Sequence, residues 1–284
     1  MNQKQISREK LKKVLVETGH YFCISYYDGE LDWIKNLNKS NYIVYNKSKE
    51  KLEKNINSIK VKNVGYNIYS YLYFIIENYE NLPETVVFCK NNIFTRHIEI
   101  STFTNLVKRN IFTCLEQNTQ MRTFPISIEL SDNSFNEINS SWYKFKYSRK
   151  YFADYNYFYK FIFNSKNIPL FIRFAPGANY IVPKNNILLR SKNFYINLLK
   201  FVYHSQFSCE SHFIERSLYL IWNSNIKSSK NMEKIISNKE LKLLINNCSK
   251  IKANEFRILE KFSQKIAFLI GNFYIKILSR SLNR

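Results

Sequence analysis

Residues 63–89 read NVGYNIYSYLYFIIENYENLPETVVFC, and this stretch decides the fold. Its first part spaces apolar residues at i, i+3, i+4 and i+7, which is the pattern of an amphipathic helix. Pro83 ends this helix, because proline fits neither the geometry nor the hydrogen bonding of a helix interior. The apolar run 85–89 then predicts a buried strand. The helix face consists of Ile68, Tyr71, Leu72, Ile75, Ile76 and Tyr79.

Two β-rich runs precede this helix, YFCISYY at 21–27 and NYIVYN at 41–46. A short helix or turn at 29–37 separates them, and a Lys- and Asn-rich connector at 47–62 follows. The alternation of strands and helices predicts an α/β fold with a mixed, mostly parallel sheet flanked by helices. Such sheets bind ligands beyond the carboxyl ends of their strands. Here those ends are residues 27–28, 46–47 and 90–92.

The second half of the chain is less regular. The stretch 131–165 is crowded with Tyr, Phe, Asn and Ser, and its pattern assigns no element. Strands are expected at 124–130, 170–174 and 179–182, and helices at about 185–204 and 210–223.

A turn joins the last two of these strands within RFAPGANYIVPKNN, residues 173–186. Gly177 follows Pro176 there, in a chain that has only five glycines and five prolines. Glycine adopts backbone conformations closed to other residues and lets a ligand approach closely. Two interpretations stay open: a purely structural tight turn, and a turn that shapes a ligand pocket which a Cβ would fill.

The composition changes at residue 225. Residues 225–284 carry 13 Lys and Arg against 4 Asp and Glu, a net charge of +9. We therefore divide the chain into an α/β domain at 1–224 and a basic helical C-terminal extension at 225–284. The extension either packs on the domain or lies as an amphipathic helix on an anionic membrane. Its apolar stripe is Ile258, Phe262, Ile266, Leu269, Phe273 and Ile277.

The whole chain of 284 residues has a net charge of +21, which attracts polyanions. Nucleic acid is an unlikely partner, because the sequence has no RNP-type motif and no zinc-finger spacing. Five widely spaced cysteines without a CxxC pair predict reduced core thiols in a cytoplasmic protein. The N-terminus predicts no signal peptide, and no apolar run reaches the roughly 20 residues of a membrane span. P-loop, GxGxxG, HExxH and GxSxG signatures are also absent from the sequence.

Two stretches place candidate ligand-binding residues at the carboxyl edge of the sheet. Asn63 and Gly65 precede the first long helix, where Asn is a good N-cap and free N–H groups favour an anion. The loop 89–97 follows a buried strand, and its amides and cations suit a pyrophosphate or sugar hydroxyls. An ordinary helix cap and a solvated polar loop are the alternatives. The loop's candidates are Asn91, Asn92, Arg96 and His97.

The helix at 209–223 carries candidate acids and bases. His212 and Glu215 share one stripe with Tyr219 and Trp222. Burial is expected to raise the pKa of Glu215, which suits a general base near neutral pH. A structural pair of Glu215 with an arginine is the alternative. Glu210 near the helix start can simply favour the helix dipole.

Taken in order, these stretches resemble a family of glycosyltransferase-like proteins of largely unknown function. The resemblance covers about residues 21–224, and its leading motifs are Asn-x-Gly, Phe-Ala-Pro-Gly-Ala and Glu-Arg. The matching residues are Glu30-Leu31-Asp32-Trp33, Tyr45-Asn46-Lys47, Asn63, Gly65, Tyr71, Leu72, Ile75, Ile76, Tyr79, Leu82, Pro83, Val87-Phe88, His97, Phe174 to Val182, Arg190, Phe194, Tyr195 and Glu215-Arg216.

The resemblance implies a nucleotide-sugar transferase with a GT-A-like fold. It implies that the first strand end and the Asn-x-Gly region hold the nucleotide, and that the loop after Val87-Phe88 faces the donor phosphates. The glycine-containing turn would shape the pocket, and a carboxylate near the last helix would act as base. The residues assigned in this way are Asp28, Glu30, Asn63 and Gly65; Asn91, Asn92, Arg96 and His97; Gly177 and Ala178; and Glu215 or Glu210.

The chain also departs from the family pattern. Relatives have Arg-Glu where this chain has Tyr66-Asn67, and they tend to have Trp at Leu218. In the loop after Val87-Phe88, Gln-Gly and Asp-His are replaced by Lys90-Asn91 and Arg96-His97. No Asp-x-Asp metal motif is present, so manganese or magnesium is not assigned and the cations are expected to stabilise charge instead.

The leading hypothesis is a cytoplasmic glycosyltransferase-like protein, in peripheral contact with an anionic membrane through its basic extension. It would transfer a sugar from a nucleotide-sugar donor to a glycan acceptor. The alternative is a non-catalytic glycan- or polyanion-binding protein that retains the fold.

Overall fold

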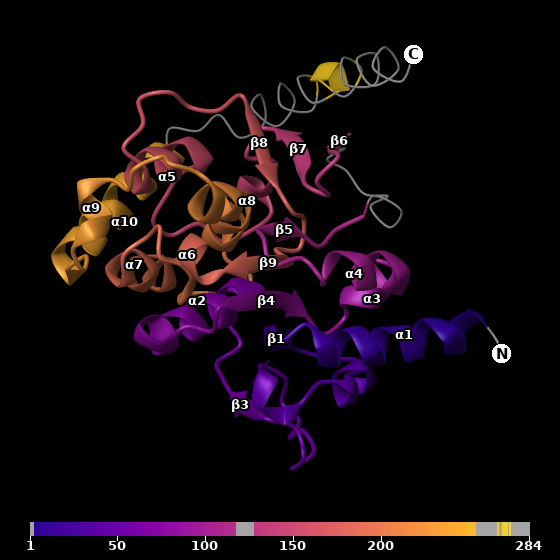
Figure 1. Cartoon of the computed structure of the whole chain (residues 1–284). Coiled ribbons are helices and arrows are strands. Elements are labelled where there is room, and N and C mark those ends of the chain that lie inside the picture. The colour runs from indigo at the N-terminus through magenta and orange to yellow at the C-terminus, as the bar shows by residue number, and fades with distance from the viewer. Residues whose placement is uncertain (1–2, 118–127, 254–265, 267–268, 272, 274–284) are drawn as a thin grey trace.

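A six-stranded mixed sheet forms the centre of the structure, in the order β3-β2-β1-β4-β9-β5 (Figure 1). In this computed structural model, residues 3–117, 128–253, 266, 269–271 and 273 are described. Strands β1 to β4 run parallel, and β9 is antiparallel to both of its neighbours. The strands are β1 (Tyr21–Tyr26), β2 (Tyr42–Asn46), β3 (Ser58–Lys60), β4 (Thr85–Lys90), β5 (Thr113–Cys114) and β9 (Tyr180–Pro183). The predicted α/β class with a mostly parallel sheet is confirmed.

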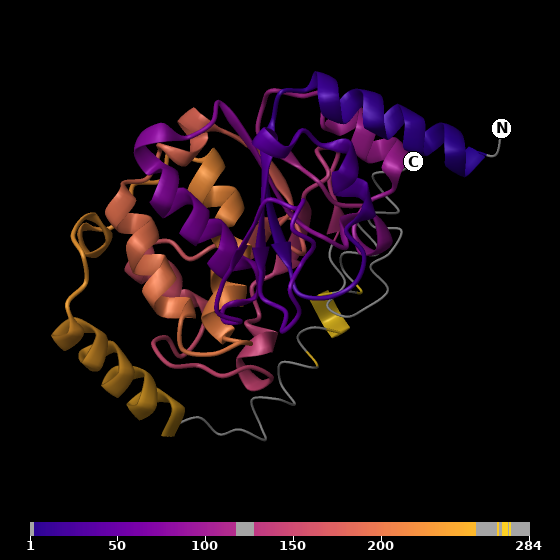
Figure 2. The same cartoon turned by 90° about the horizontal axis from the view of Figure 1, so that it is seen from below.

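Helices cover both faces of this sheet, so the strands are buried on both sides. Along β4 the side chains alternate between two separate cores, with Val86 and Phe88 in one and Val87 and Cys89 in the other. The first core lies under α2 (Tyr66–Asn78), α7 (Lys192–Val202) and α8 (Cys209–Asn223). The second lies under α1 (Gln3–Glu17) and α4 (Ile100–Leu106). Figure 2 shows α1 in indigo on the opposite side of the sheet from α2 in purple and α7 in orange.

A second, antiparallel sheet consists of β6 (Ile128–Glu129), β7 (Phe135–Ile138) and β8 (Phe171–Phe174). Helix α8 packs against β8 and also against α2, so it lies between the two sheets. The turn at 175–179 leads from β8 directly into β9 of the large sheet. This turn therefore joins the two sheets.

The remaining elements are short apart from the last helix. They are η1 (Asp32–Asn36), η2 (Lys39–Asn41), η3 (Tyr79–Asn81), α3 (Ile93–Arg96), η5 (Trp142–Phe145), α5 (Tyr155–Ile162), α6 (Lys184–Ile187), α9 (Lys230–Glu233) and α10 (Asn238–Ala253). None of the helices in the described part of the chain is both long and apolar enough to cross a membrane.

Several expected elements differ from the observed ones. The connector at 47–62 contains the edge strand β3, which pairs with β2. The helix expected at 185–204 is two helices, because the Ser191 side chain accepts a hydrogen bond from the Phe194 N–H and starts α7 afresh. The unassigned stretch 131–165 contains β7, η5 and α5. Of the strand expected at 124–130, residues 124–127 lie outside the described residues, and 128–129 form β6.

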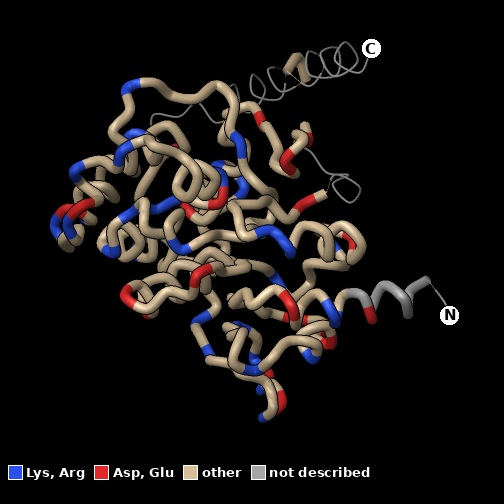
Figure 3. The backbone as a smooth tube through the Cα atoms, in the orientation of Figure 1, with Lys and Arg blue, Asp and Glu red and all other residues tan. Residues whose placement is uncertain are grey.

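The first part of the basic extension packs on the first core. Met232 and Ile236 are buried there. The Asn197 side chain on α7 donates to the Lys234 carbonyl (2.8 Å) and accepts from the Ile236 N–H (2.9 Å). Most of the helix expected near the C-terminus lies outside the described residues. Lys and Arg are spread over many elements of the described chain (Figure 3).

Candidate functional site

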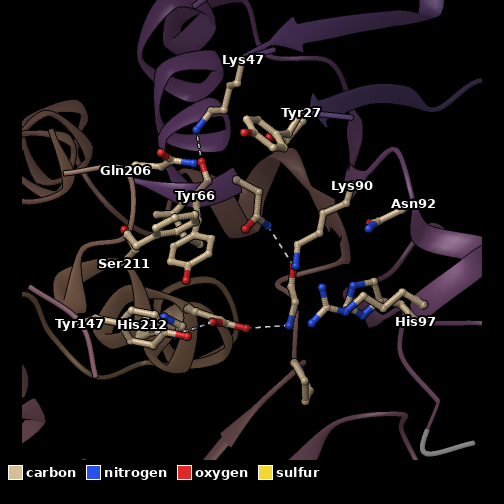
Figure 4. Close-up of a pocket in the computed structure, with 18 of the residues that line it drawn as sticks. Tyr27, Lys47, Tyr66, Lys90, Asn92, His97, Tyr147, Gln206, Ser211 and His212 are labelled. Atoms are coloured by element: carbon tan, nitrogen blue, oxygen red, sulfur yellow. Dashed lines mark hydrogen bonds and ion pairs between the residues drawn. The ribbon is translucent and has the colours of Figure 1, made fainter. Parts of the chain in front are cut away.

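A cavity of about 820 Å³ opens at the carboxyl ends of β1 and β4 (Figure 4). The chain runs outward from β1 to β2 and β3, then returns through α2 to β4 on the other side of β1. Parallel sheets bind ligands at such a switch point. The cavity also reaches α8 and the turn at 175–179. The predicted site residues that line it are Asp28, Asn63, Asn91, Asn92, Arg96, His97, Gly177 and Glu215.

One side of the cavity is cationic. Lys90 is the last residue of β4, and Arg96 follows it in α3. Within the described residues, neither side chain donates a hydrogen bond or forms an ion pair, although both line the cavity. Burial lowers the pKa of Lys90. The Glu215 carboxylate opposes this shift, the nearby positive charge of Arg96 adds to it, and Glu116 opposes it more weakly. An anion in the cavity would stabilise both charges.

Lys47, the residue after β2, is a third cation at the cavity. Its Nζ donates to the Val64 carbonyl at 2.6 Å and also to the Tyr66 carbonyl. Burial lowers the pKa of Lys47 to about 7. Lys47 therefore ties the end of β2 to the start of α2.

The start of α2 is capped differently from the prediction; its first-turn residues Asn67 and Ile68 line the cavity, and an anion site there stays a prediction. The helix begins at Tyr66 with Gly65 as its N-cap, and Asn63 is not the capping residue. The N–H groups of Gly65 and Tyr66 already donate to the carbonyls of Ser205 (2.9 Å) and Gln206 (3.2 Å). A Cβ on Gly65 would lie 2.8 Å from the Val202 Cβ. Gly65 is thus required for the contact between α2 and α7, and it does not line the cavity.

The loop after β1 is held by Asn91. The Asn91 Nδ2 donates to the backbone carbonyls of Asp28 (2.6 Å) and Glu30 (3.4 Å). Its amide therefore has a structural partner before any ligand binds. The Glu30 side chain is exposed and does not line the cavity, whereas Asp28 does.

His97 explains the glycine in the turn at 175–179. The His97 Nδ1 lies 2.8 Å from the Glu116 Oε2, and both groups are buried. Burial lowers the pKa of His97 and raises the pKa of Glu116. A Cβ on Gly177, which has a φ of 84°, would lie 2.3 Å from the His97 Cε1. The close approach that requires glycine is therefore made by the imidazole ring of the protein itself.

Ala178 supports the same turn from outside the cavity. It is fully buried, has a φ of 58°, and its N–H donates to the Ala175 carbonyl (2.9 Å). The structure therefore gives Ala178 a backbone role in the turn, and it does not line the cavity.

Glu215 faces the cavity from α8, but its expected pKa shift is wrong in direction. Its Oε1 accepts the Gly177 N–H at 2.6 Å, and its Oε2 lies 3.5 Å from the His212 Nδ1. Burial alone would raise the pKa of Glu215. The hydrogen bond from His212 and the charges of Arg216, His212 and Lys90 outweigh burial and lower that pKa to about 2. Glu215 is therefore ionised at neutral pH. Arg216 itself forms its main ion pair with Glu137 (3.0 Å).

Glu210, the second candidate base, lies outside the cavity. Its Oε1 accepts the N–H groups of Lys150 (2.8 Å) and Tyr151 (2.7 Å), and its Oε2 lies 2.9 Å from the His204 Nε2. The side chain is fully buried and its oxygens are all engaged. This carboxylate holds the 150–151 loop onto α8, so the structure gives Glu210 a structural role and does not place it at the cavity.

The cavity does not present a metal site. No group of three or more His, Cys, Asp or Glu residues in the described part of the chain is arranged to hold a cation. Two of the cavity's carboxylates are already engaged, Glu137 with Arg216 and Glu215 with Gly177. These donors do not fit manganese or magnesium, so no step proposed below runs through a metal.

The sequence analysis missed functional candidates of two kinds. Lys47 follows β2, and Lys90 is the last residue of β4. Their position at the carboxyl ends of parallel strands could have identified both residues from the sequence. Tyr147 and Glu116 gave no such signal, because they reach the site only through long-range packing; Tyr66 directly follows the predicted residue Gly65, and that position could have found it.

A family model described as "Protein of unknown function (DUF3431)" matches residues 24–237. The chain belongs to this family. The match includes both sheets and α8, and it ends just before α10. A search of curated proteins gave no match. A search of solved structures gave none either. The description of the family names no activity, so the proposed function rests on the geometry of the cavity.

The contact between Gly177 and His97 predicts a strong coupling between these positions. Gly177→Ala should lower the free energy of unfolding by about 2–4 kcal/mol, because the backbone is left-handed and the new Cβ meets the imidazole. His97→Ala should recover part of that loss, which a double-mutant cycle by urea unfolding measures. Pro183→Ala is the control and should be mild. Additive effects of Gly177→Ala and His97→Ala would contradict the contact.

The lowered pKa of Glu215 predicts a pH-dependent contribution to stability. The pKa of Glu215 in the folded state lies below its unfolded value of about 4.5. Ionised Glu215 therefore stabilises the folded state fully above about pH 4.5, and this stabilisation is lost as the pH falls toward 2. Glu215→Gln should therefore cost up to about 3 kcal/mol near pH 6 and progressively less below about pH 4.5. Urea unfolding of both proteins between about pH 6 and pH 3.5 measures this. Glu84→Gln, an exposed carboxyl, is the control; a Glu215 difference that is constant with pH would rule the shift out.

Proposed function

We propose that the cavity binds a nucleotide sugar and that the protein transfers its sugar to a glycan acceptor. The observation that carries this proposal is the pair Lys90 and Arg96, two cations at the switch point whose side chains make no hydrogen bond or ion pair within the described chain. Cations placed in this way suit a diphosphate, whose charge grows as the sugar leaves. The cavity volume of about 820 Å³ also falls in the range of sites for ligands of this size.

The proposal gives each part of the donor a place in the cavity. The nucleoside lies toward Asp28 and Asn63 beyond β1, and the diphosphate lies between Lys90 and Arg96. In the transfer step the bond between the anomeric carbon and the diphosphate oxygen breaks, and its electron pair leaves with the nucleoside diphosphate. The acceptor hydroxyl oxygen bonds to the anomeric carbon. The GT-A-like identity of the fold is part of this proposal, which the mixed sheet supports only at the level of class.

Glu215 is the proposed acceptor of the hydroxyl proton. With a pKa of about 2 it is a weaker base than a carboxylate tuned to neutral pH. A hydroxyl oxygen that is bonding to the anomeric carbon is far more acidic than a free alcohol, however, so an ionised carboxylate suffices. Its hydrogen bond to the Gly177 N–H fixes the carboxylate in the cavity.

A second candidate is a non-catalytic glycan- or polyanion-binding protein that retains the fold. One observation favours it: both oxygens of Glu215 already have neighbours within the protein, Gly177 and His212. Under this proposal the cavity binds its ligand and Glu215 only holds the turn. A cytoplasmic location and contact with an anionic membrane through the basic extension are proposals under either candidate.

Removing the cations should weaken the binding of nucleoside diphosphates. Lys90→Ala and Arg96→Ala should each weaken UDP or GDP binding by roughly 10- to 100-fold, because each loses a charge-assisted hydrogen bond. Isothermal titration calorimetry measures this. Lys160→Ala, which removes an exposed charge on α5, is the matched control and should bind like the wild type. Unchanged affinity in both cavity variants would refute the proposed phosphate position.

Glu215→Gln separates the two candidate functions. Gln keeps an oxygen that can accept the Gly177 N–H but removes the proton acceptor. For the enzyme, sugar transfer should fall by about 100-fold or more while nucleotide binding stays within about threefold. Transfer is followed as release of nucleoside diphosphate from UDP- and GDP-sugars in the presence of glycan acceptors. Equal turnover in wild type and variant would remove Glu215 from the chemistry, and no turnover in the wild type would favour the binding protein.

A further inference from the structure

Tyr66 has a strained backbone at the edge of the cavity. Its φ is 49°, in the left-handed region that bulky aromatic residues rarely adopt. The preceding Gly65 is also left-handed, with a φ of 63°. Strain of this kind persists only when the surroundings over-determine it, and it concentrates at functional positions.

Two separate segments hold Tyr66 in this conformation. The Lys47 Nζ donates to the carbonyl of Tyr66 and to that of Val64. The Tyr66 N–H donates to the Gln206 carbonyl at 3.2 Å, and the Gly65 N–H donates to the Ser205 carbonyl at 2.9 Å. Hydrogen bonds from a buried lysine and to the 205–206 loop thus fix the backbone at Tyr66.

The strained backbone directs the Tyr66 ring into an aromatic wall of the cavity. We use this name for Tyr66, Tyr147, Phe207 and His212, all of which line the cavity. The Tyr66 ring centroid lies 4.9 Å from that of Phe207 and 5.1 Å from that of His212, and Tyr147 stacks on His212 at 4.3 Å. Phe207 remains 47% exposed at the cavity. Figure 4 shows Tyr66, Tyr147 and His212 together, across the cavity from Asn92 and His97.

Polar groups border this wall. Gln206, Ser211 and the Glu215 carboxylate line the same cavity. Neighbouring rings meet Tyr66 at 88° for Tyr147, 72° for His212 and 52° for Phe207, so none of these three rings lies parallel to it to form a slot. A single ring surface bordered by an amide, a hydroxyl and a carboxylate matches a pyranose, which has an apolar C–H face and hydroxyls around its rim. A planar nucleobase would stack better between two parallel rings.

We infer that the aromatic wall is a subsite for a pyranose ring of the acceptor glycan, with Tyr66 as the residue that contacts it. This inference rests on the proposed function, because the donor diphosphate then occupies the opposite side, at Lys90 and Arg96. The acceptor hydroxyl is held beside Glu215. Both signs of charge border this subsite, since Lys146 lines the cavity and lies over the Tyr147 ring (5.3 Å) while Glu215 supplies a carboxylate.

The test compares variants at position 66 in the full-length chain. Tyr66→Asn removes the ring and tolerates a left-handed backbone, and Tyr66→Phe keeps the ring. Asn133→Gly is the matched control, since Asn133 has a φ of 64° but does not line the cavity. Calorimetry measures binding of cellotetraose, chitotetraose and mannotetraose to each protein, and of UDP and GDP in parallel.

At least one tetrasaccharide should bind the wild type and bind Tyr66→Asn roughly tenfold more weakly, while Tyr66→Phe and Asn133→Gly bind like the wild type. Tyr66→Asn should melt within a few degrees of the wild type, because the loss of ring contacts is offset by relief of strain. UDP and GDP affinities should not change.

Three results would overturn the inference. In the first, none of the three tetrasaccharides binds the wild type. In the second, Tyr66→Asn binds the tetrasaccharides as tightly as the wild type does. In the third, Tyr66→Asn loses as much affinity for UDP or GDP as it does for sugars. The last result would show that the ring stacks on a nucleobase. Tyr66-dependent sugar binding by a protein that binds neither nucleotide would sustain the subsite and reject the proposed transferase instead.

Discussion

The hydrogen bond from the Gly177 N–H to the Glu215 carboxylate determines how the rest of the structure is assembled. The turn that contains Gly177 joins the two sheets, and Glu215 lies on the helix packed between them. Asn67 on α2 donates to the carbonyl of the same glycine (2.9 Å), and the His97 ring packs against its Cα. One turn is thus fixed by α8, α2 and the 89–97 loop, which are the segments that also line the cavity.

Several features of the cavity cost stability in the free protein. Lys90 is buried near the positive charge of Arg96, Lys47 is buried against two carbonyls, and Tyr66 is held with a positive φ. Proteins tolerate such costs mainly at sites where binding offsets them. A bound anion would offset the cost at Lys90, whereas the contacts of Lys47 and Tyr66 shape the cavity before any ligand binds.

The parallel sheet and its ligand edge could be predicted because their signals are local: strand runs at 21–27 and 85–89, and helical spacing broken by Pro83. That edge was enough to bring Asp28, Asn92 and Arg96 to one cavity. The low pKa of Glu215 was not predicted, although His212 and Arg216, two of the groups that lower it, lie within three residues of it in sequence; Lys90, the third, reaches it only in the folded chain. The roles of Gly65 and Glu210 were missed for the same reason: Val202 and the 150–151 loop reach them only in the folded chain.

The structural role of Glu215 bears on how descent within the family should be interpreted. A relative whose cavity bound nothing would still need this carboxylate and the glycine opposite it, because they hold the turn between the sheets. Their retention among relatives would therefore record inheritance of the architecture. The side chains of Lys90 and Arg96 make no hydrogen bond in the described fold, so selection for folding alone would let them change. Their persistence in a lineage would be the better sign that its members bind an anion in the cavity.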